Sequence, residues 1–185
     1  MIDPQDDPIA LVPSRFEHWQ AAFEQEQDRV IALAEARGFM SDIQRIEHVG
    51  STAIPHLAAK DIVDLDIVVN DSAVNAVARA IAVELGGTRF QNTDRWHPVF
   101  RIANGQRFND HVFAASSDRW KVSVLTREML VEDCSLRTEY EELKMELCTE
   151  HDELGEYSRA KTAFFDRLLA QAQHAPHLEV DFDLP

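Results

Sequence analysis

Long apolar runs are absent from this sequence, and no stretch approaches the length of a membrane-spanning helix. The N-terminal residues, MIDPQDDPIALVP, lack the basic and apolar parts of a secretory signal peptide. Cysteine is also scarce, since only Cys134 and Cys148 occur and both lie in segments with helical periodicity. Their spacing fits neither a metal site nor a disulfide framework, so we expect two reduced thiols. Together these absences predict a cytoplasmic protein.

Basic residues are few. The chain has 33 acidic and 18 basic residues and a formal charge of −15. Such a charge repels nucleic-acid backbones and anionic lipids, so neither a long nucleic acid nor a membrane is expected as a partner. A small anion is still allowed, because a cleft with a metal ion and a few lysines can be positive inside an acidic molecule.

The length of 185 residues and a hydrophobic content of 45% predict one globular domain over residues 1–185. Within it we expect a leader at residues 1–13 and an acidic, flexible tail at residues 173–185, because chain ends are often poorly ordered.

Hydrophobic periodicity predicts helices at both ends of the chain and strands in the middle. A first helix begins with capping-box spacing at Ser14–Glu17 and ends at Gly38. Arg45–Val49 is short and extended, and Ile62–Val69, rich in β-branched residues, is the clearest strand. A second helix is then expected to follow a cap at Asp71 or Ser72 and to end at Gly86–Gly87.

The rest of the chain predicts a hairpin followed by helices. Asn104-Gly105 lies between two extended runs, which is the strongest short hairpin signal. From Ser117 onward, three helices are expected. The predicted fold is therefore α+β: a small mixed β-sheet flanked by helices, with a helical C-terminal third.

Two aspartates share one face of the clearest strand. In VDLDI, side chains alternate, so Asp64 and Asp66 point one way and the aliphatic residues the other. Like charges on one face of a sheet repel. The pair fits either an ordinary acidic face or a site for Mg²⁺, which prefers oxygen ligands.

A Gly-Ser loop precedes that strand. Gly50 lets the backbone approach a ligand closely, and Ser51 offers a hydroxyl and an N–H donor. A Gly-Ser followed by an Asp-x-Asp strand, as here, resembles the polymerase-β-like nucleotidyltransferase superfamily.

A closer resemblance, to the GrpB family of that superfamily, covers almost the whole chain. Members are sometimes attached to dephospho-coenzyme A kinase, which implies a link to coenzyme A biosynthesis. The matching pieces are IALVP with Trp19 and Phe23, IEHVGSTAIP, LAAKDIVDLDIVV, Arg107 with His111-Val112, Trp120, REML at 127–130, Tyr140 with Leu143-Lys144, and Tyr157 with Lys161. The chain departs from the family at Ser14, at His56 and at Asn109-Asp110-His111, where members tend to have Tyr, Gly and His-x-His.

The resemblance implies Mg²⁺-dependent transfer of a nucleotidyl or phosphoryl group from a nucleoside triphosphate to a small acceptor. Asp64 and Asp66 would hold the metal and act in catalysis, and Gly50, Ser51 and Thr52 would cradle phosphate. The residues expected to bind the nucleotide or to complete a positive wall opposite the aspartates are Lys60, Arg107, His111, Arg127, Lys144, Tyr157 and Lys161.

Two questions stay open at this point. Superfamily enzymes carry a third carboxylate on a later strand, for which Asp110 is the candidate, but alternation places Asp110 opposite Asn109 and His111. Only one of these sets can face the site. The alternative function is a non-catalytic module that binds a nucleotide or phosphorylated metabolite, because a fold does not guarantee its chemistry.

Overall fold

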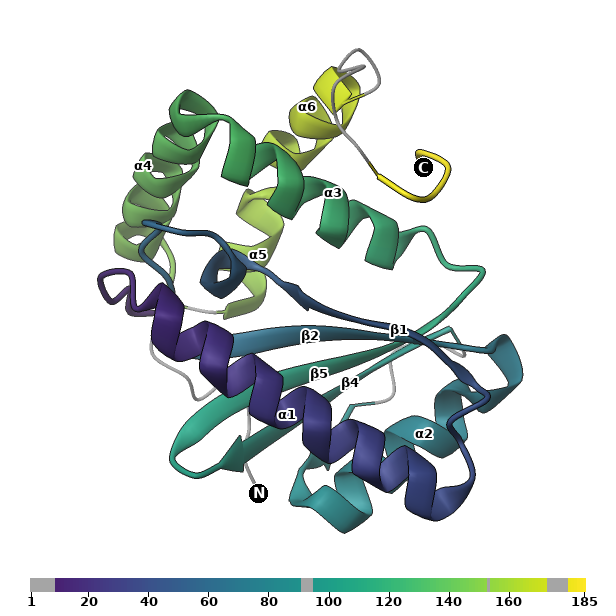
Figure 1. Cartoon of the computed structure of the whole chain (residues 1–185). Coiled ribbons are helices and arrows are strands. Elements are labelled where there is room, and N and C mark those ends of the chain that lie inside the picture. Colours follow the sequence, from purple (N-terminus) through teal and green to yellow (C-terminus); the bar gives the residue numbers. More distant parts are fainter. Residues whose placement is uncertain (1–8, 91–94, 153, 173–179) are drawn as a thin grey trace.

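The computed structural model describes residues 9–90, 95–152, 154–172 and 180–185 (Figure 1). Within these ranges, five strands form one sheet in the order β1-β2-β5-β4-β3. Only β2 and β5 are parallel, and the other neighbours are antiparallel. The strands are β1 (Ile43–Val49), β2 (Ile62–Val69), β3 (Thr88–Arg89), β4 (Trp96–Ala103) and β5 (Gln106–Ala114).

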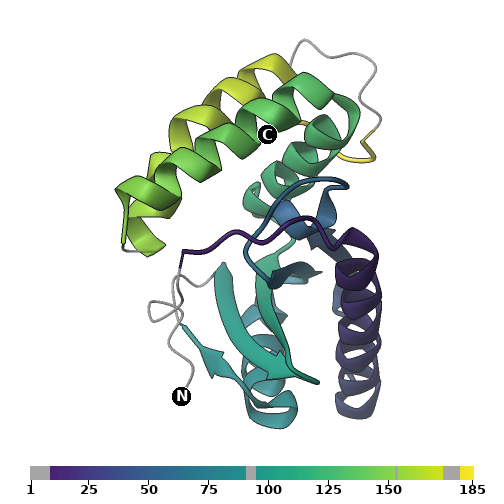
Figure 2. The same cartoon turned by 90° about the vertical axis from the view of Figure 1, so that its left-hand side faces the viewer.

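Helices lie on both sides of this mixed sheet (Figures 1 and 2). On one side are α1 (Phe16–Arg37) and α2 (Val74–Ala80), the latter continued by a π-helical turn. The C-terminal helices lie toward the other side and form a layer of their own: α3 (Arg119–Glu132), α4 (Cys134–Glu150), α5 (Leu154–Ala160) and α6 (Thr162–Ala172). The fold is α+β, as the sequence predicts.

Alternation along β2 separates the core from the cavity side of the sheet. Val63, Leu65 and Ile67 are fully buried and pack in one cluster with Trp19 and Val30 of α1. Asp64 and Asp66 therefore point to the opposite face, which turns toward the C-terminal helices. The hydrophobic face thus fixes the direction of both carboxylates.

The predicted hairpin joins β4 to β5. Asn104 and Gly105 both have positive φ, +52° and +80°, and Ala103 pairs with Gln106 across a two-residue turn. Positive φ at both central positions matches the right-handed twist of the flanking strands. The register that follows sets Asn109 beside Asp64 and His111 beside Asp66 on β2.

Several local expectations need correction. No side chain caps α1, whose N-cap residue is Arg15, so the capping box at Ser14–Glu17 does not form. Asp71 does not cap α2 either, because its carboxylate accepts hydrogen bonds from Ser116 instead. The C-terminal part has four helices in the described residues rather than three, since a turn at Lys161 separates α5 from α6. Gly38 does end α1, with φ +74°.

The described parts of the two chain ends make specific contacts. Val12 forms an antiparallel bridge with Ala59, with N···O distances of 2.8 and 3.1 Å. At the other end, Asp181 pairs with Arg45, and Phe182 packs edge-on against Trp120. Residues 1–8 of the expected leader and 173–179 of the expected tail lie outside the described residues. In the described chain, no helix is long and apolar enough to cross a membrane.

A buried ion cluster joins α1, β4 and β5 on the core face. Arg101 of β4 lies with its Nε 2.8 Å from Glu26 and 3.2 Å from Asp110, and all three side chains are almost completely buried. Arg29 adds a second, partly exposed cation beside Glu26. Burial and the charge of Glu26 raise the pKa of Asp110 well above its usual value, against the opposing charge of Arg101.

We predict that Arg101→Met lowers the free energy of unfolding by about 3–5 kcal/mol, because it removes the buried cation that Glu26 and Asp110 share. Urea unfolding at neutral pH measures this loss. The control is Arg37→Met, which breaks the exposed ion pair with Glu84 and should cost less than about 1 kcal/mol. Equal losses in the two variants would contradict a stabilising role for the buried cluster.

Candidate functional site

A cavity of about 500 Å³ opens on the sheet face that carries Asp64 and Asp66. Its floor is formed by β2, β5 and β4, and its walls by the loop after β1 and by α3 to α6. This cavity brings together most of the residues singled out in the sequence. They are Gly50, Ser51, Thr52, Lys60, Asp64, Asp66, His111, Lys144, Tyr157 and Lys161.

The Gly-Ser loop touches the acidic strand directly. Gly50 has φ +70° and ψ −170°, a conformation that is almost restricted to glycine. A Cβ atom at this position would lie 2.5 Å from Oδ2 of Asp64, closer than any real contact. Glycine is therefore required here both by its backbone angles and by the approach to the carboxylate. Residues Ser51–Ala53 then form one 3₁₀ turn above β2.

Asp64 is held by two side chains of β5. The amide nitrogen of Asn109 donates to Oδ1 of Asp64 over 3.0 Å, and Nε2 of His111 lies 3.6 Å from the same oxygen. Burial by itself would raise the pKa of Asp64, but hydrogen bonds and charge from His111, together with Lys60, hold it below its usual value. Asp64 is thus a stable carboxylate, and its Oδ2 is the oxygen that faces Gly50.

Asp66 is in the opposite electrostatic state. Its side chain is buried, and Oδ2 has no hydrogen-bond partner. Burial raises the pKa of Asp66 to about 7, reinforced by the negative charges of Asp64 and Glu47. Near neutral pH without a ligand, this carboxylate therefore holds a proton far more readily than an exposed aspartate does. A cation bound beside Asp66 would stabilise the charged carboxylate and so lower its pKa.

His111 is fixed by its neighbours on the floor. The indole N–H of Trp96 donates to Nδ1 of His111 over 3.0 Å, and the two rings stack with centroids 5.6 Å apart. Burial lowers the pKa of His111, but Asp64 and Asp66 outweigh burial and raise it overall. Trp96 acts against protonation, because its N–H needs a free lone pair on Nδ1. The other ring nitrogen, Nε2, lies 2.7 Å from the amide nitrogen of Asn109.

Lys144 reaches the Gly-Ser loop from α4. Its ammonium donates to Oγ of Ser51 over 3.2 Å and to the carbonyl of Ala58, and it lies 4.8 Å from the ring centroid of Tyr140. Burial lowers the pKa of Lys144 to about 7, helped by the nearby charge of Lys161. Burial likewise raises the pKa of Tyr140 to about 12.

Lys60 and Lys161 both lie close to the ring of Tyr157. The ammonium of Lys161 is 4.3 Å from the ring centroid, and that of Lys60 is 5.9 Å from it. Burial lowers the pKa of Lys161 to about 8, with a further contribution from Lys60, and burial also lowers the pKa of Lys60. Three of the five basic residues expected in the positive wall thus line one cavity.

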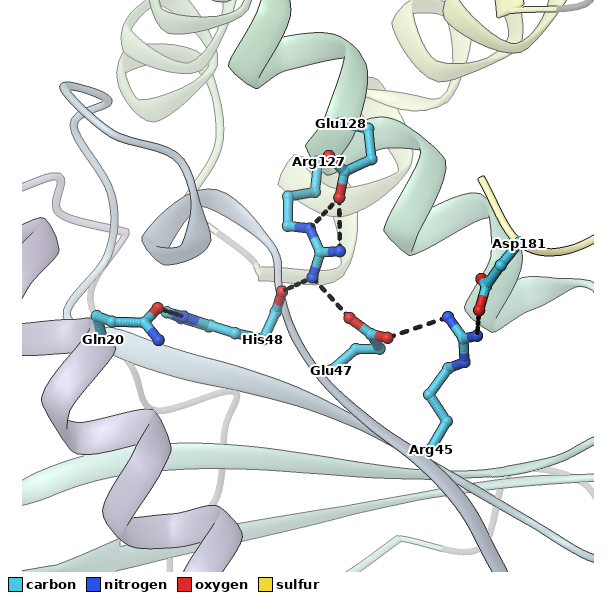
Figure 3. A network of polar contacts seen from close by, with 7 residues as sticks. All are labelled: Gln20, Arg45, Glu47, His48, Arg127, Glu128 and Asp181. Carbon is cyan, nitrogen blue, oxygen red and sulfur yellow. Dashed lines mark hydrogen bonds and ion pairs between the residues drawn. The ribbon is translucent and has the colours of Figure 1, made fainter. Parts of the chain in front are cut away.

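The other two basic residues do not line it. Arg127 lies beyond β1, where it pairs with Glu47 and Glu128 and donates to the carbonyl of His48 over 2.7 Å (Figure 3). Its hydrogen bonds are taken up by these partners. Arg107 is on the same face of β5 as His111 but lies nearer the hairpin, outside the residues that line the cavity.

The prediction of Asp110 as the third catalytic acid is also wrong. It points to the core face and belongs to the buried cluster with Arg101, while Asn109 and His111 face the cavity. The open question from the sequence is therefore answered in favour of Asn109 and His111. A signal for this was present, because Asp110 shares one face of β5 with Phe108 and Val112, which are apolar core residues.

The loop residue Thr52 turns its hydroxyl under the site. Its Oγ1 lies 3.1 Å from Nε2 of His48, whose ring stacks on Phe23 at 4.9 Å. Burial lowers the pKa of His48 to about 4, so this ring is neutral at physiological pH. His48 is thus a packing residue, and the hydroxyl of Thr52 is used in positioning the loop.

Sequence reasoning missed the apolar part of the lining. Trp96, Pro98 and Phe100 of β4 lie on the cavity side, together with Tyr140 of α4 and Phe165 of α6. Trp96, Pro98 and Phe100 have the period-two spacing of one strand face, which could have identified them once β4 was aligned beside β5.

The residues present suit a hard cation only in part. Asp64 and Asp66 supply carboxylate oxygens from one face of β2, and Oδ2 of Asp66 is buried without a hydrogen-bond partner. Among the residues that the structure describes, no three His, Cys, Asp or Glu side chains are grouped so that they could hold a metal ion. Any Mg²⁺ would therefore need further oxygens from water or from a phosphate.

The fold and this cavity define a class of protein: an α+β chain with a mixed sheet and a polar cavity on one face. The family described as "GrpB protein" matches residues 8–171. UPF0157 proteins of Deinococcus radiodurans and Halalkalibacterium halodurans are 32% and 27% identical over 155 and 157 residues, in each case 83% of this chain and 77% of the relative. This chain belongs to the GrpB family.

A solved structure agrees with this assignment at the level of fold. The crystal structure of the conserved protein GrpB from Enterococcus faecalis has a TM-score of 0.73, covering 89% of this chain and 98% of that one at 21% identity. At this identity the likeness establishes a shared fold, and the chemistry has to be argued from the site.

We predict that Gly50→Ala destabilises the protein by more than the roughly 1–2 kcal/mol expected for a left-handed backbone alone, because the new methyl group collides with Asp64. The control is Gly38→Ala, at φ +74° with no atom within 4 Å of the added Cβ. Chemical unfolding of both variants, and of Gly50→Ala in an Asp64→Ala background, isolates the contact. A Gly50→Ala cost equal to that of Gly38→Ala would disprove the close approach.

Proposed function

We propose that this protein is a nucleotidyltransferase of the polymerase-β-like type, which transfers a nucleotidyl or phosphoryl group from a nucleoside triphosphate to a small acceptor. One observation carries the proposal: Asp64 and Asp66 share a cavity with Lys60, Lys144 and Lys161. Acids that suit a divalent cation and lysines that suit phosphate are the two sets of groups that such a transfer needs.

The lysines and the Gly-Ser loop are the part of the cavity that would bind phosphate. Ser51 and Lys144 are joined at the start of the loop, so they would hold phosphate oxygens, with Lys60 and Lys161 on the same side. Gly50 allows the phosphate-binding loop to lie against Asp64. A bound anion would raise the lowered pKa values of these lysines, so that they take up protons. The lysine side chains would then carry more positive charge with the anion bound than without it.

Mg²⁺ is part of this proposal. Asp64 and Asp66 would hold it, because each offers an oxygen toward the cavity. When bound, the cation would supply positive charge that neutralises the charge developing on the leaving group. In the transfer, an acceptor oxygen bonds to phosphorus while the bond to the bridging oxygen breaks. The leaving phosphate takes that bond's electron pair, and the acceptor proton passes to solvent.

The second candidate function is binding without turnover. It is favoured by the neighbours of the two acids on β5, Asn109 and His111, which are not carboxylates. A phosphorylated metabolite or nucleotide would then be a regulatory ligand. The resemblance to proteins linked with coenzyme A biosynthesis makes its phosphorylated precursors the first metabolites to try.

One experiment separates the two functions. Purified protein is screened by thermal shift against nucleoside triphosphates and coenzyme A precursors, with and without Mg²⁺, and phosphate or pyrophosphate release is then measured with each stabilising ligand. Stabilisation with release supports transfer. Stabilisation without release over a broad panel of acceptors supports the binding module, and no stabilisation by any phosphate compound contradicts both.

We predict that Asp66→Asn leaves the unfolding free energy of the ligand-free protein unchanged or raised above pH 7. The pKa of Asp66 in the folded protein is about 7, far above its unfolded value, so ionisation of Asp66 costs stability as pH rises through 7. Asp64→Asn should be destabilising instead, since the pKa of Asp64 is lowered by folding. Thermal melting at pH 8 compares them.

The same two variants should lose any stabilisation by Mg²⁺ with ATP, because a neutral amide is a poor ligand for a hard cation. Full retention of the Mg²⁺ effect in both variants would remove these aspartates from the metal site.

We predict that tripolyphosphate binds more weakly as pH rises through 7 and 8, because Lys144 and Lys161 then lose their protons in the free protein. Without ligand, the unfolding free energy should rise over the same interval, since the unfolded chain holds more lysine protons than the folded one. Isothermal titration and urea unfolding measure the two opposite slopes.

Lys144→Gln keeps a donor toward Ser51 but loses the charge, and it should weaken tripolyphosphate binding by about tenfold or more. The matched control is Lys121→Gln on α3, whose ammonium pairs with Asp118 away from the cavity. Equal affinities in the two variants would rule out Lys144 as a phosphate ligand.

A further inference from the structure

The cavity has two chemically different sides. On one side, Ser51 accepts a hydrogen bond from the buried ammonium of Lys144. On the other side, the residues of β4 that line the cavity are Trp96, Pro98 and Phe100. The first side suits an anion, and the second offers a mainly apolar surface with two aromatic rings.

The order of the strands places the acids between these sides. Ser51 follows β1 directly, and β1 pairs with β2 along one edge. On the other edge of β2 come β5 and then β4, so the apolar side lies two strand spacings, roughly 10 Å, from the acidic strand. Asp66, His111 and Pro98 are successive neighbours across the sheet, as are Asp64, Asn109 and Phe100.

We propose that the β4 side is the acceptor subsite and that the acceptor is an apolar, ring-bearing molecule with a hydroxyl or amine nucleophile, rather than a sugar. This inference rests on the proposed transfer reaction. In an in-line displacement, the nucleophile enters opposite the leaving group. If Ser51 and Lys144 hold the leaving phosphates, the nucleophile must come from the direction of β5 and β4.

The contacts of the two aromatic rings of β4 indicate which of them the ring of the acceptor would stack on. The guanidinium of Arg119 sits 5.0 Å from the ring centroid of Trp96 and covers that ring, which is also held by its hydrogen bond to His111. Phe100 is partly exposed and meets Phe90 edge-on at 5.5 Å. Phe100 is therefore the ring of the floor that a ligand can stack on, and Pro98 beside it is buried.

The polar border of this floor suits the nucleophile. Asn109 lies next to Phe100 and His111 next to Pro98, and both also touch Asp64. A ring stacked on Phe100 would place an attached hydroxyl over β5, next to the two acids. Apolar walls with a few converging polar groups are the usual make-up of a small-molecule subsite.

The test uses 4-nitrobenzyl alcohol as the aromatic probe and sorbitol as the polar one, titrated calorimetrically into protein that contains tripolyphosphate and Mg²⁺. We expect the aromatic alcohol to bind and sorbitol not to bind. Phe100→Ser should weaken the aromatic alcohol by roughly fivefold, the value of one aromatic contact, and Phe100→Leu by less. The control is Ile102→Ser, on the same face of β4, 51% exposed and outside the cavity lining.

A second readout does not depend on the folding of the Phe100 variants. The nitro ring quenches tryptophan fluorescence at short range, and Trp96 lies on the same face of β4 as Phe100, whereas Trp19 and Trp120 are buried in the protein. Binding at the floor should quench the wild-type protein, and Trp96→Phe should remove most of that quenching.

The acceptor assignment is overturned if sorbitol binds as well as the aromatic alcohol, if Phe100→Ser and Ile102→Ser bind the alcohol equally, or if no alcohol binds while tripolyphosphate does. The last outcome leaves the proposed function standing. Absence of tripolyphosphate binding, measured in the same titrations, would instead overturn the transfer reaction, and with it the role of the floor as an acceptor subsite.

Discussion

The contact between Gly50 and Asp64 is the constraint on which the site depends. Any side chain at position 50 would overlap the carboxylate of Asp64. Because Gly50 has none, the backbone after β1 can lie directly against β2. That approach brings Ser51 to the edge of the acidic strand, where Lys144 reaches it from α4. The close approach at Gly50 therefore allows the contact between Ser51 and Lys144 that connects the sheet to the C-terminal helices. The cavity lies between these two layers.

The charges inside that cavity are balanced in an unusual way. Burial pushes Asp66 and Lys144 toward pKa values of about 7, and Lys161 toward about 8. Burial thus shifts each of these groups toward its neutral form, which limits the cost of burying so many ionisable side chains. A phosphate or a cation would restore the charges of opposite sign. The ionisation of these groups would therefore change when such a ligand binds, and three lysines line one cavity of a chain whose net charge is −15.

The sequence predicted the parts of the site that depend on local pattern. Alternation in β2 and the Asn104-Gly105 turn were sufficient to place Asp64 and Asp66 on one face and to join β4 to β5. Long-range packing decided the rest. Arg127 matches a family motif, but its partners Glu47 and Glu128 hold it behind β1, and no local pattern reports that a cation is already paired. The metal, nucleotide and acceptor roles stay predictions until ligands are tested.

Strand β5 shows why the third acid could not be assigned from position alone. Successive residues of one strand face opposite layers, so Asp110 joins Glu26 and Arg101 in the core while Asn109 and His111 face the cavity. The buried charge and the site are thus fixed by the same backbone. A carboxylate turned toward the cavity from β5 would lie beside Asp64 and Asp66 and add a third like charge. With the amide of Asn109 there instead, the β5 side of the cavity donates a hydrogen bond to Asp64, which adds to the larger effect of His111 in holding the pKa of Asp64 below its usual value despite burial.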